Sequence, residues 1–511
     1  MVRLRHARRR PMAGPHAGVR PAWAGIVGAR EGARHRAWLV GAACRPRSRR
    51  PMKILQVCHH FLPRHRAGVE VYTDGVARAL QGRGHEVTVL TTDDDGTRRP
   101  WSLRREEQDG LPVISIAHPR IARSPDDSLG RQEVNDAFAR ALDETQPDVV
   151  HFQHLMYIGL DAPALVRARG VRSVMTLHEY WLLCARGGQM RRTDGVVCEQ
   201  AEAGTCARCL QDFRFGRTPG EARIAGACSW VRRLTGWDPF PSLKRVKERR
   251  QAQNPHTDIA LRHNHGEGML EWLSCRTDRV RALWNAVDRF LCPSRFLMET
   301  FVRDGWPVDR MSWSPYGIPM IASESPLSPP PLARLRIGFI GTITPAKGTD
   351  VVARAHALLP RGKATLSIWG SGASSPAYAA GVRAALVPGE AEFAGAFAAG
   401  RAADALAGLD VLVVPSTWYE NAPLVISEAF RNGVPVVASR LGGMAEMVTD
   451  GVDGYLFEPG SAEDLARVLL TLVEDREALA RLRSGITSPR TVDDDAGSLE
   501  ALYRELAGAP A

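Results

Sequence analysis

The chain has 511 residues, of which 44% are hydrophobic and 24% are charged, and its formal net charge is +11. Residues 1–50 hold 13 Arg, no Lys and one acid, Glu31, so the rest of the chain, with 54 basic and 55 acidic side chains, has a net charge of −1. This composition excludes a collagen-like or fully disordered chain. The charge distribution excludes a basic, nucleic-acid-binding surface as a property of the whole protein.

The length predicts two or three domains. Nine Cys are too few for a disulfide scaffold, which predicts a reducing, cytoplasmic setting. No run of 18 uncharged apolar residues occurs, so we expect no membrane-spanning helix. The Arg-rich residues 1–51 show no helical or strand period and predict a disordered extension, either a tail or a start assigned too far upstream. A transit peptide or a nucleic-acid-binding tail is the less favoured interpretation.

From Met52 onward, short apolar strands alternate with helices, which predicts a doubly wound α/β domain over residues 52–317. The apolar runs are continuous, as in parallel strands that are buried on both faces. Strands are expected at residues 54–57, 85–91, 113–116, 149–152, 174–177 and 290–292, and helices at 69–81, 131–144 and 159–169. Residues 180–285 interrupt the alternation with several Cys and with Trp- and Arg-rich stretches, so they predict a Cys-containing helical insert.

The Pro- and Ser-rich residues 318–335 predict a linker. Residues 336–490 then predict a second α/β domain, and residues 491–511 predict a C-terminal helix that covers 497–507. In the second domain, strands are expected at 337–340, 365–369, 411–414 and 434–438, and helices at 348–358, 401–407, 423–432 and 462–473. The predicted fold class is therefore α/β, with two Rossmann-like domains facing across a cleft at the carboxyl ends of both sheets.

The segment 411–446, VLVVPSTWYENAPLVISEAFRNGVPVVASRLGGMAE, is the most informative for function. A strand ends at Val414, a loop carries Glu420, and Pro423 stands where a helix begins, so Glu428 lies further along that helix. Backbone amides at such a helix start, together with the positive end of the helix dipole, can hold a diphosphate. The residues that supply this helix start are Asn421, Ala422, Pro423 and Leu424.

The two glutamates of this segment are spaced E-x7-E and would be repelled by phosphate. A carboxylate accepts hydrogen bonds from vicinal hydroxyls, so we expect one glutamate on the sugar and the other on the ribose of a nucleotide-sugar. The alternative is a capped helix with surface acids, which the spacing alone would favour. The surrounding strand, loop, Pro and helix favour the nucleotide-sugar site.

Further turns carry glycines that allow a close approach to phosphate. In GFIGTITPAKG, a strand ends at Gly341 and Lys347 precedes a helix, where a lysine supplies a positive charge. The turn Arg440–Glu446 offers glycine amides to the same anion, and the turn Trp369–Gly372 would border the base. Each of these turns, taken alone, is equally an ordinary strand–helix connection.

The first half contributes two candidates. Gly68 lies in the loop before a helix, where its amide would meet the donor phosphate, and His178 follows the strand VMTL, where it would bond a sugar hydroxyl. The structural alternatives are a flexible turn residue and a packed histidine.

These motifs together resemble those of the retaining glycosyltransferases of family 4, which have the GT-B fold. The matching segments, in the family's order over residues 53–450, are PRHRAGVE, TLHEYW, GTITPAKG, YENAPLVISEA and GGMAE. The resemblance implies an enzyme that transfers a sugar from a nucleotide-sugar donor to an acceptor hydroxyl with retention of configuration, in polysaccharide or glycoconjugate biosynthesis.

The resemblance also implies residue roles. Glu420 would face the donor sugar, Glu428 would bind the ribose, and Lys347 would offset the diphosphate charge as the leaving group departs. Gly68 would approach the phosphate, and His178 would bind hydroxyls near the reacting carbon. The departing phosphate would help to deprotonate the acceptor, so the family needs no enzymic nucleophile.

Two positions depart from the family pattern. Thr342 stands where an Arg often follows the glycine of the phosphate loop, and Ala67 replaces the first glycine of the usual pair before the first helix. Thr342 cannot make the cationic contact that an Arg would make with the phosphate. The methyl group of Ala67 leaves less room for the phosphate beside the backbone.

Cys184, Cys198, Cys206 and Cys209 are spaced C-x13-C-x7-C-x2-C, which is compatible with a structural tetrathiolate zinc. A similar Cys-rich insert occurs in some members of the resembling family. Because spacings of 13 and 7 fit no standard zinc finger, partly buried free thiols are an equal alternative. The resemblance implies no cofactor for catalysis, and the triplet 93–95 of Asp predicts a solvated loop.

Other functions remain open alternatives. Another GT-B enzyme, such as a nucleotide-sugar epimerase or a sugar phosphorylase, would share the fold, and a zinc-stapled nucleic-acid-binding protein would use the basic tail. The acceptor is expected to be a glycan, a lipid-linked molecule or a small molecule. A lipid-linked acceptor would favour peripheral contact with the inner face of the membrane through the basic residues 242–250, whose alternative is a solvated helix face.

Overall fold

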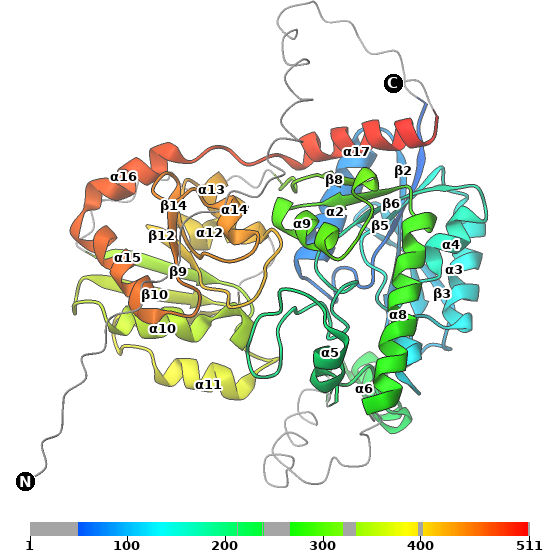
Figure 1. Cartoon of the computed structure of the whole chain (residues 1–511), viewed down its shortest axis with the longest axis horizontal. Coiled ribbons are helices and arrows are strands. Elements are labelled where there is room, and N and C mark those ends of the chain that lie inside the picture. Colours follow the sequence, from blue (N-terminus) through cyan, green and yellow to red (C-terminus); the bar gives the residue numbers. More distant parts are fainter. Residues whose placement is uncertain are drawn as a thin grey trace, which may run out of the picture. The chain divides into compact units, whose positions relative to one another are not determined.

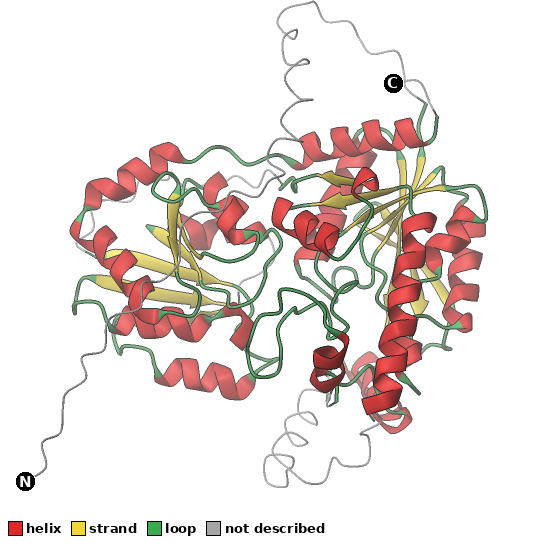
Figure 2. Cartoon of the chain, in the orientation of Figure 1, coloured by secondary structure: helices red, strands yellow, loops and turns green. Residues whose placement is uncertain are grey.

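The structure is a computed structural model, and it describes residues 50–211, 213–237, 239, 266–319, 334–396 and 402–508. Two sheets organise this part of the chain, and each is covered by helices (Figures 1 and 2). The predicted extension over residues 1–51, apart from its last two residues, lies outside the described residues. So do most of the predicted linker and the basic residues 242–250.

The N-terminal sheet has eight strands in the order β3-β4-β2-β1-β5-β6-β7-β8, and all neighbours are parallel except the β3–β4 hairpin. Six of these strands are predicted from apolar runs. The edge strands β3 and β8 are not, because β3 reads LRREEQ and β8 has only three residues. The strands are β1 Lys53–Val57, β2 Glu86–Asp93, β3 Leu103–Gln108, β4 Leu111–Ala117, β5 Val149–Phe152, β6 Arg172–Thr176, β7 Arg289–Cys292 and β8 Met311–Trp313.

Helices cover this sheet, and three of those described belong to the insert between β6 and β7. The N-terminal lobe contains α2 Gly68–Gly82, α3 Gln132–Thr145, α4 Ala162–Arg167, α9 Arg295–Arg303 and, in the insert, α5 Ala203–Cys209, α6 Pro219–Thr235 and α8 Gly266–Ala286. The helix predicted over 159–169 is therefore shorter than expected. Helix α6 begins with a capping box, in which the Thr218 side chain accepts a hydrogen bond from the Glu221 amide (3.2 Å).

The C-terminal sheet has six parallel strands in the order β11-β10-β9-β12-β13-β14. They are β9 Leu335–Ile340, β10 Ala364–Trp369, β11 Ala391–Gly395, β12 Val411–Val414, β13 Val436–Ser439 and β14 Gly454–Phe457. The helices of this lobe are α10 Thr349–Ala357, α11 Pro376–Ala384, α12 Ala402–Ala407, α13 Leu424–Arg431, α14 Met444–Met447, α15 Ala462–Glu474 and α16 Arg476–Gly485. The central strands are continuous apolar runs, which confirms the prediction of doubly wound parallel sheets.

The last helix, α17 Val492–Leu506, packs against the N-terminal lobe (Figure 1). Its Leu499 and Tyr503 belong to the buried cluster that contains Val76 of α2. The helix begins five residues earlier than predicted, because Thr491 caps it by accepting from the Asp494 amide (3.1 Å). The chain therefore returns to its first lobe after completing the second.

No helix within the described ranges is both long and apolar enough to cross a bilayer. The predicted peripheral contact with a membrane is a separate matter, and it stays a prediction.

Candidate functional site

Glu420 lies in the loop after β12 and is 8% exposed. Its Oε1 accepts hydrogen bonds from Lys347 Nζ (2.6 Å), Ser416 Oγ (2.8 Å) and Trp418 Nε1 (2.7 Å). Burial acts to raise the pKa of this carboxyl, but the Lys347 ammonium and the three hydrogen bonds outweigh it, so the pKa lies below its ordinary value. Oε2 accepts no hydrogen bond from any residue that the structure describes, so it is available to a ligand.

Lys347 is held in place by its backbone. It ends the short 3₁₀ turn Pro345–Lys347, to which Thr417 bonds twice, from its amide to Ala346 O (2.9 Å) and from Oγ1 to Pro345 O (3.1 Å). Gly348, with φ of +64°, follows, and a Cβ there would lie 2.0 Å from Pro415 O. The two loops that carry Lys347 and Glu420 are thus joined independently of the ion pair.

Glu428 lies on α13, four residues after its first residue. Its carboxylate is partly buried and has no hydrogen-bond or ion-pair partner in the described part of the chain. Burial therefore raises its pKa. A desolvated carboxylate without a protein partner is suited to accept hydrogen bonds from a ligand's hydroxyls.

The start of α13 offers free donors. Pro423 is its N-cap and makes no side-chain cap, and the amides of Ala422, Leu424 and Val425 donate to no group among the described residues. Together with the helix dipole they form an anion-binding terminus. The helix starts one residue later than predicted, at Leu424, and the binding of an anion by residues 421–424 stays a prediction.

Gly68 is the first residue of α2 and follows the N-cap Ala67. A Cβ added to Gly68 would lie 3.9 Å from Leu424 Cδ1, so the first residues of α2 and α13 are neighbours. Two helix N-termini, each with unpaired amides and a partial positive charge, meet at this point. The close approach predicted for Gly68 is therefore toward the start of α13, and its contact with a phosphate stays a prediction.

Two further candidate glycine amides are already bonded within the protein. Gly341 N donates to Trp369 O (3.0 Å), and Gly443 N donates to Glu420 O (2.9 Å). A Cβ at Gly443 would lie 1.4 Å from Asn421 O, so only glycine fits there. The Gly443 amide is therefore used to position the Glu420 loop, and the expectation that the Arg440–Glu446 turn offers glycine amides to the anion stays a prediction for Gly442.

His178 is 8% exposed, and both of its ring nitrogens are bonded within the protein. Nε2 lies 2.7 Å from Gln153 Oε1, and Nδ1 lies 2.6 Å from Tyr316 Oη. Because an amide oxygen only accepts, Nε2 carries the proton and the tyrosine donates to Nδ1. Burial lowers the pKa, so the ring is neutral. The predicted bond of His178 to a sugar hydroxyl stays a prediction, and it requires an exchange of one of these bonds.

Asn421 connects the two lobes. Its Oδ1 accepts from Ser294 Oγ (2.6 Å), and its Nδ2 donates to Leu177 O (3.1 Å) and His178 O (3.0 Å). The sequence suggests a role only for the backbone of Asn421, at the helix start that would hold the diphosphate. Nothing in the local sequence identifies the partners, because they lie more than 120 residues away in the chain.

Glu446 makes a second connection that the sequence does not reveal. Its two carboxylate oxygens accept from the amides of Arg295 and Phe296, both at 3.0 Å, at the start of α9. An acid at a helix N-terminus is stabilised by the unpaired amides there. With Asn421, it fixes the Glu420 loop against the N-terminal lobe.

The acidic triplet 93–95, which begins with the last residue of β2, is paired with arginines instead of forming a solvated loop. Asp93 bonds Arg98 (2.5 Å), Asp94 bonds Arg217 (2.7 Å), and Asp95 contacts Arg64 (3.4 Å).

The four cysteines of the insert, Cys184, Cys198, Cys206 and Cys209, are free thiols. Burial, together with the three other thiols, raises the pKa of Cys206 to about 11, so the four lie in one region. In the described parts of the chain, however, no group of three or more His, Cys, Asp or Glu is arranged to hold a metal ion. The residues as placed do not fit a zinc ion, and the structural zinc stays a prediction.

Elemental analysis tests that prediction. If the cysteines bind zinc, protein purified without chelator should contain about one zinc per chain, and Cys206→Ser should remove it, because a tetrathiolate site needs all four ligands. The exposed Cys275→Ser, which is remote in sequence from the four, is the matched control. A metal-free wild-type protein would leave the four residues as free thiols.

Two α/β sheets, the second with E-x7-E at a helix start, are typical of a GT-B protein. Two family models match the chain, "Glycosyl transferase 4-like domain" over residues 67–210 and "Glycosyl transferases group 1" over residues 334–475. Together they cover more than half of the chain. The chain therefore belongs to the group 1, family 4 glycosyltransferases.

Sequence similarity to other glycosyltransferases supports this assignment. The D-inositol 3-phosphate glycosyltransferase of Stackebrandtia nassauensis is 34% identical over 194 residues, which are 34% of this chain and 44% of the relative. The GDP-mannose-dependent alpha-mannosyltransferase of Mycobacterium tuberculosis is 29% identical over 248 residues, 43% of this chain and 59% of the relative. The matches thus span about half the length of these relatives.

The fold is that of solved GT-B structures. The Anabaena protein HepE in complex with UDP and glucose has a TM-score of 0.56 and 16% identity, over 89% of this chain and 100% of that one. The sucrose-phosphate synthase of Thermosynechococcus elongatus has a TM-score of 0.59 and 17% identity, over 90% and 100%. At these identities the likeness shows the fold.

Proposed function

We propose that this protein transfers a sugar from a nucleotide-sugar to an acceptor hydroxyl with retention of configuration, in the assembly of a polysaccharide or another glycoconjugate. The observation that carries the proposal is the pair of glutamates around the α13 start. Glu420 is buried and ionised beside Lys347, and Glu428 is desolvated. Among the described residues, one oxygen of Glu420 and the whole carboxylate of Glu428 have no partner. Free amides lie between them.

In the proposed reaction, the bond between the anomeric carbon and the diphosphate oxygen breaks, and a bond to the acceptor oxygen forms on the same face. The acceptor proton passes to the departing diphosphate. The amides of Ala422 and Leu424 stabilise the charge that develops on this leaving group, and Lys347 adds a positive charge close to Glu420. No step requires a metal or an enzymic nucleophile.

Nuclear magnetic resonance tests the retention. The donor and the product are compared by the coupling constant of the anomeric proton, which differs between axial and equatorial linkages. The proposal expects the same anomeric configuration in both. A product of inverted configuration at first appearance would contradict the same-face route, although sugar transfer itself would stand.

A screen of nucleotide-sugars by thermal unfolding tests the donor. UDP- and GDP-sugars come first, because HepE is solved with UDP and a relative is GDP-mannose-dependent. A donor at 100 times its Kd should stabilise the folded protein by about 2.7 kcal/mol. Hydrolysis assays detect weak donors that give no shift. The donor proposal fails if no donor stabilises the protein and none is hydrolysed.

The pH dependence of donor binding identifies Glu428. Only the ionised carboxylate accepts two hydrogen bonds from the ribose diol, and burial raises its pKa. Donor affinity should therefore fall with decreasing pH through a value above the ordinary glutamate pKa of about 4.3. Glu428→Gln should bind the donor about tenfold to 100-fold more weakly at pH 7, without this acid-side loss.

The same variant has a stability signature that separates lost binding from lost folding. A carboxyl whose folded-state pKa is raised destabilises the folded protein above that pKa, so Glu428→Gln should unfold at an equal or higher temperature at pH 7 without ligand. Calorimetry measures this. Unchanged donor affinity in Glu428→Gln would remove Glu428 from the site.

A further inference from the structure

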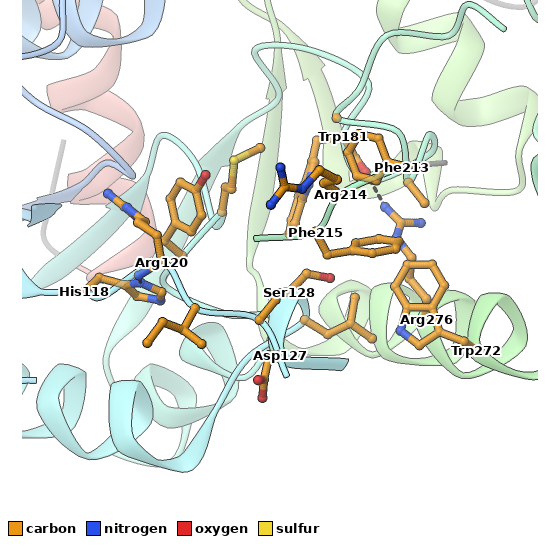
Figure 3. Close-up of a pocket in the computed structure, with 17 residues that line it drawn as sticks. His118, Arg120, Asp127, Ser128, Trp181, Phe213, Arg214, Phe215, Trp272 and Arg276 are labelled. Atoms are coloured by element: carbon orange, nitrogen blue, oxygen red, sulfur yellow. Dashed lines mark hydrogen bonds between the residues drawn. The ribbon is translucent and has the colours of Figure 1, made fainter. Parts of the chain in front are cut away.

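A cavity of about 110 Å³ lies in the N-terminal lobe, and all of its lining residues belong to this lobe. Its walls come from the segment between β4 and α3, from the segment after β5 and from the insert, including α8. Figure 3 shows His118 and Arg120 on one side, Trp272 and Arg276 on the other, and Arg214 between them. This volume suits a charged group with part of one ring.

Aromatic rings form much of the cavity wall. Phe215 lies edge-on to Trp272, with ring centroids 4.9 Å apart, and Phe213 lies edge-on to Phe215 at 5.0 Å. Trp181, three residues after His178, lies on the same side of the cavity as Phe213 (Figure 3). Rigid aromatic faces offer apolar surface to the C–H face of a sugar ring while its hydroxyls point elsewhere.

The charge of the lining is positive. It contains three arginines, Arg120, Arg214 and Arg276, against one acid, Asp127. Asp127 is already neutralised by Arg123, at 3.0 Å, and Arg131, at 3.6 Å. Arg276 donates to two backbone carbonyls, which satisfy its hydrogen bonds but do not cancel its charge.

Arg120 is a buried cation that contacts no acidic side chain among the residues that the structure describes. It is 6% exposed, its guanidinium lies over the Tyr157 ring at 3.6 Å, and its Nη2 lies 3.2 Å from His60 Nδ1. Burial lowers its pKa to about 10, so it stays charged at neutral pH. Its Nη1 is buried without a hydrogen-bond partner. A buried, charged guanidinium with an unbonded N–H is stabilised by a bound anion.

The unsatisfied atoms indicate the same kind of ligand. Two buried polar side-chain atoms of the described lining residues have no partner, Arg120 Nη1 and Trp272 Nε1, and both are donors. Arg214, at the exposed side, donates to Glu221 (2.6 Å), an ion pair that a ligand anion can replace.

One loop connects the cavity with the proposed reaction centre. Arg120 contacts His60 in the loop that leads from β1 to Gly68, and Gly68 neighbours the start of α13. We propose that this cavity binds the acceptor of the sugar transfer, and that the acceptor is an anionic sugar or polyol whose ring packs on Phe215 and whose phosphate or carboxylate pairs with Arg120 and Arg214. This inference rests on the proposed function, because it names the acceptor of that reaction.

Titration calorimetry on the full chain without donor tests the proposal, with glucose 6-phosphate, glucuronate and glucose as probes. We expect at least one anionic hexose to bind tenfold or more tightly than glucose. If glucose 6-phosphate binds more tightly than glucuronate, the anionic group of the acceptor is a phosphate. If glucuronate binds more tightly, the group is a carboxylate. If glucose binds as tightly, or no anionic hexose binds, the proposal is overturned.

Variants locate the binding. Arg214→Gln should weaken binding of the anionic hexose at least tenfold, Phe215→Leu should weaken it several-fold, and Arg208→Gln, an exposed arginine of α5 outside the lining, should leave it unchanged. Both cavity variants keep Arg120 and so avoid a new buried void at its site. If Arg214→Gln binds the anionic hexose with wild-type affinity, the hexose binds elsewhere, such as at the α13 start. That result overturns the acceptor assignment. Because these titrations contain no donor, their failure leaves the donor proposal standing, and the nucleotide-sugar screen leaves this one standing.

Discussion

Replacing Glu420 by Gln should lower kcat/KM for sugar transfer by about 100- to 1000-fold while the protein stays folded. Hydrogen bonds to a charged group contribute about 1.5–3 kcal/mol each, and each 1.36 kcal/mol corresponds to about a tenfold change in rate. The amide keeps the shape of the carboxyl but loses the charge that holds Lys347 and one of the oxygens that would accept sugar hydroxyls. Steady-state kinetics at saturating acceptor measure this.

The control for this variant is Glu474→Gln, at an exposed position at the end of α15. It removes the same charge from the same lobe away from the proposed site, so its kinetics should match the wild type. Wild-type kcat/KM in Glu420→Gln would show that the carboxylate does not contact the donor sugar.

Replacing Lys347 by Met should reduce activity about 100-fold at pH 7 and move the acid limb of the pH profile to higher pH. In the wild type, burial raises the pKa of Glu420, but Lys347 lowers it overall. Without the ammonium, burial dominates, and the pKa of Glu420 rises. Because the ionised form is the acceptor of hydroxyl hydrogen bonds, activity is then lost at a higher pH than in the wild type.

The stability of the Lys347→Met variant has a defined pH dependence. A carboxyl with a depressed folded-state pKa stabilises the protein above its unfolded pKa, and this contribution is lost as pH falls through the folded-state value. The variant should therefore be less stable than the wild type at pH 7, by about 2 kcal/mol, because Lys347 is partly exposed and breaking a fully buried pair costs more. The difference should vanish on acidification below the folded-state pKa of Glu420.

Lys363→Met, at an exposed position, controls for the loss of a positive charge in this lobe. It should change neither the pH profile nor the acid dependence of stability. A pH-independent stability difference in Lys347→Met would indicate that Lys347 acts by packing and does not set the ionisation of Glu420.

The fold could be predicted because its central strands are apolar runs with no other compatible structure. Runs such as VLVV at 411–414 and ILQV at 54–57 are too short for helices and lack alternation. Pro423 likewise marks the start of α13, because proline fits the first positions of a helix. Edge strands such as β3 carry no comparable signal, since their exposed faces accept charged residues.

The site was only partly predictable, because the tertiary fold determines which side chains form hydrogen bonds and ion pairs with one another. The sequence indicates Glu420, Glu428 and Lys347 as chemical groups, yet it does not indicate that Lys347 and Glu420 form an ion pair 73 residues apart. It suggests that His178 bonds a sugar hydroxyl or is packed, but it does not indicate that Gln153 and Tyr316 bond both ring nitrogens. Contacts of this kind have no local pattern, so only the folded chain shows them.

A crystal structure with the nucleoside diphosphate of the preferred donor tests the central claim most directly. The account predicts the diphosphate within hydrogen-bond distance of the Ala422 and Leu424 amides, and the ribose hydroxyls on the Glu428 carboxylate. A nucleotide that binds at another place, or with its ribose away from Glu428, would contradict it.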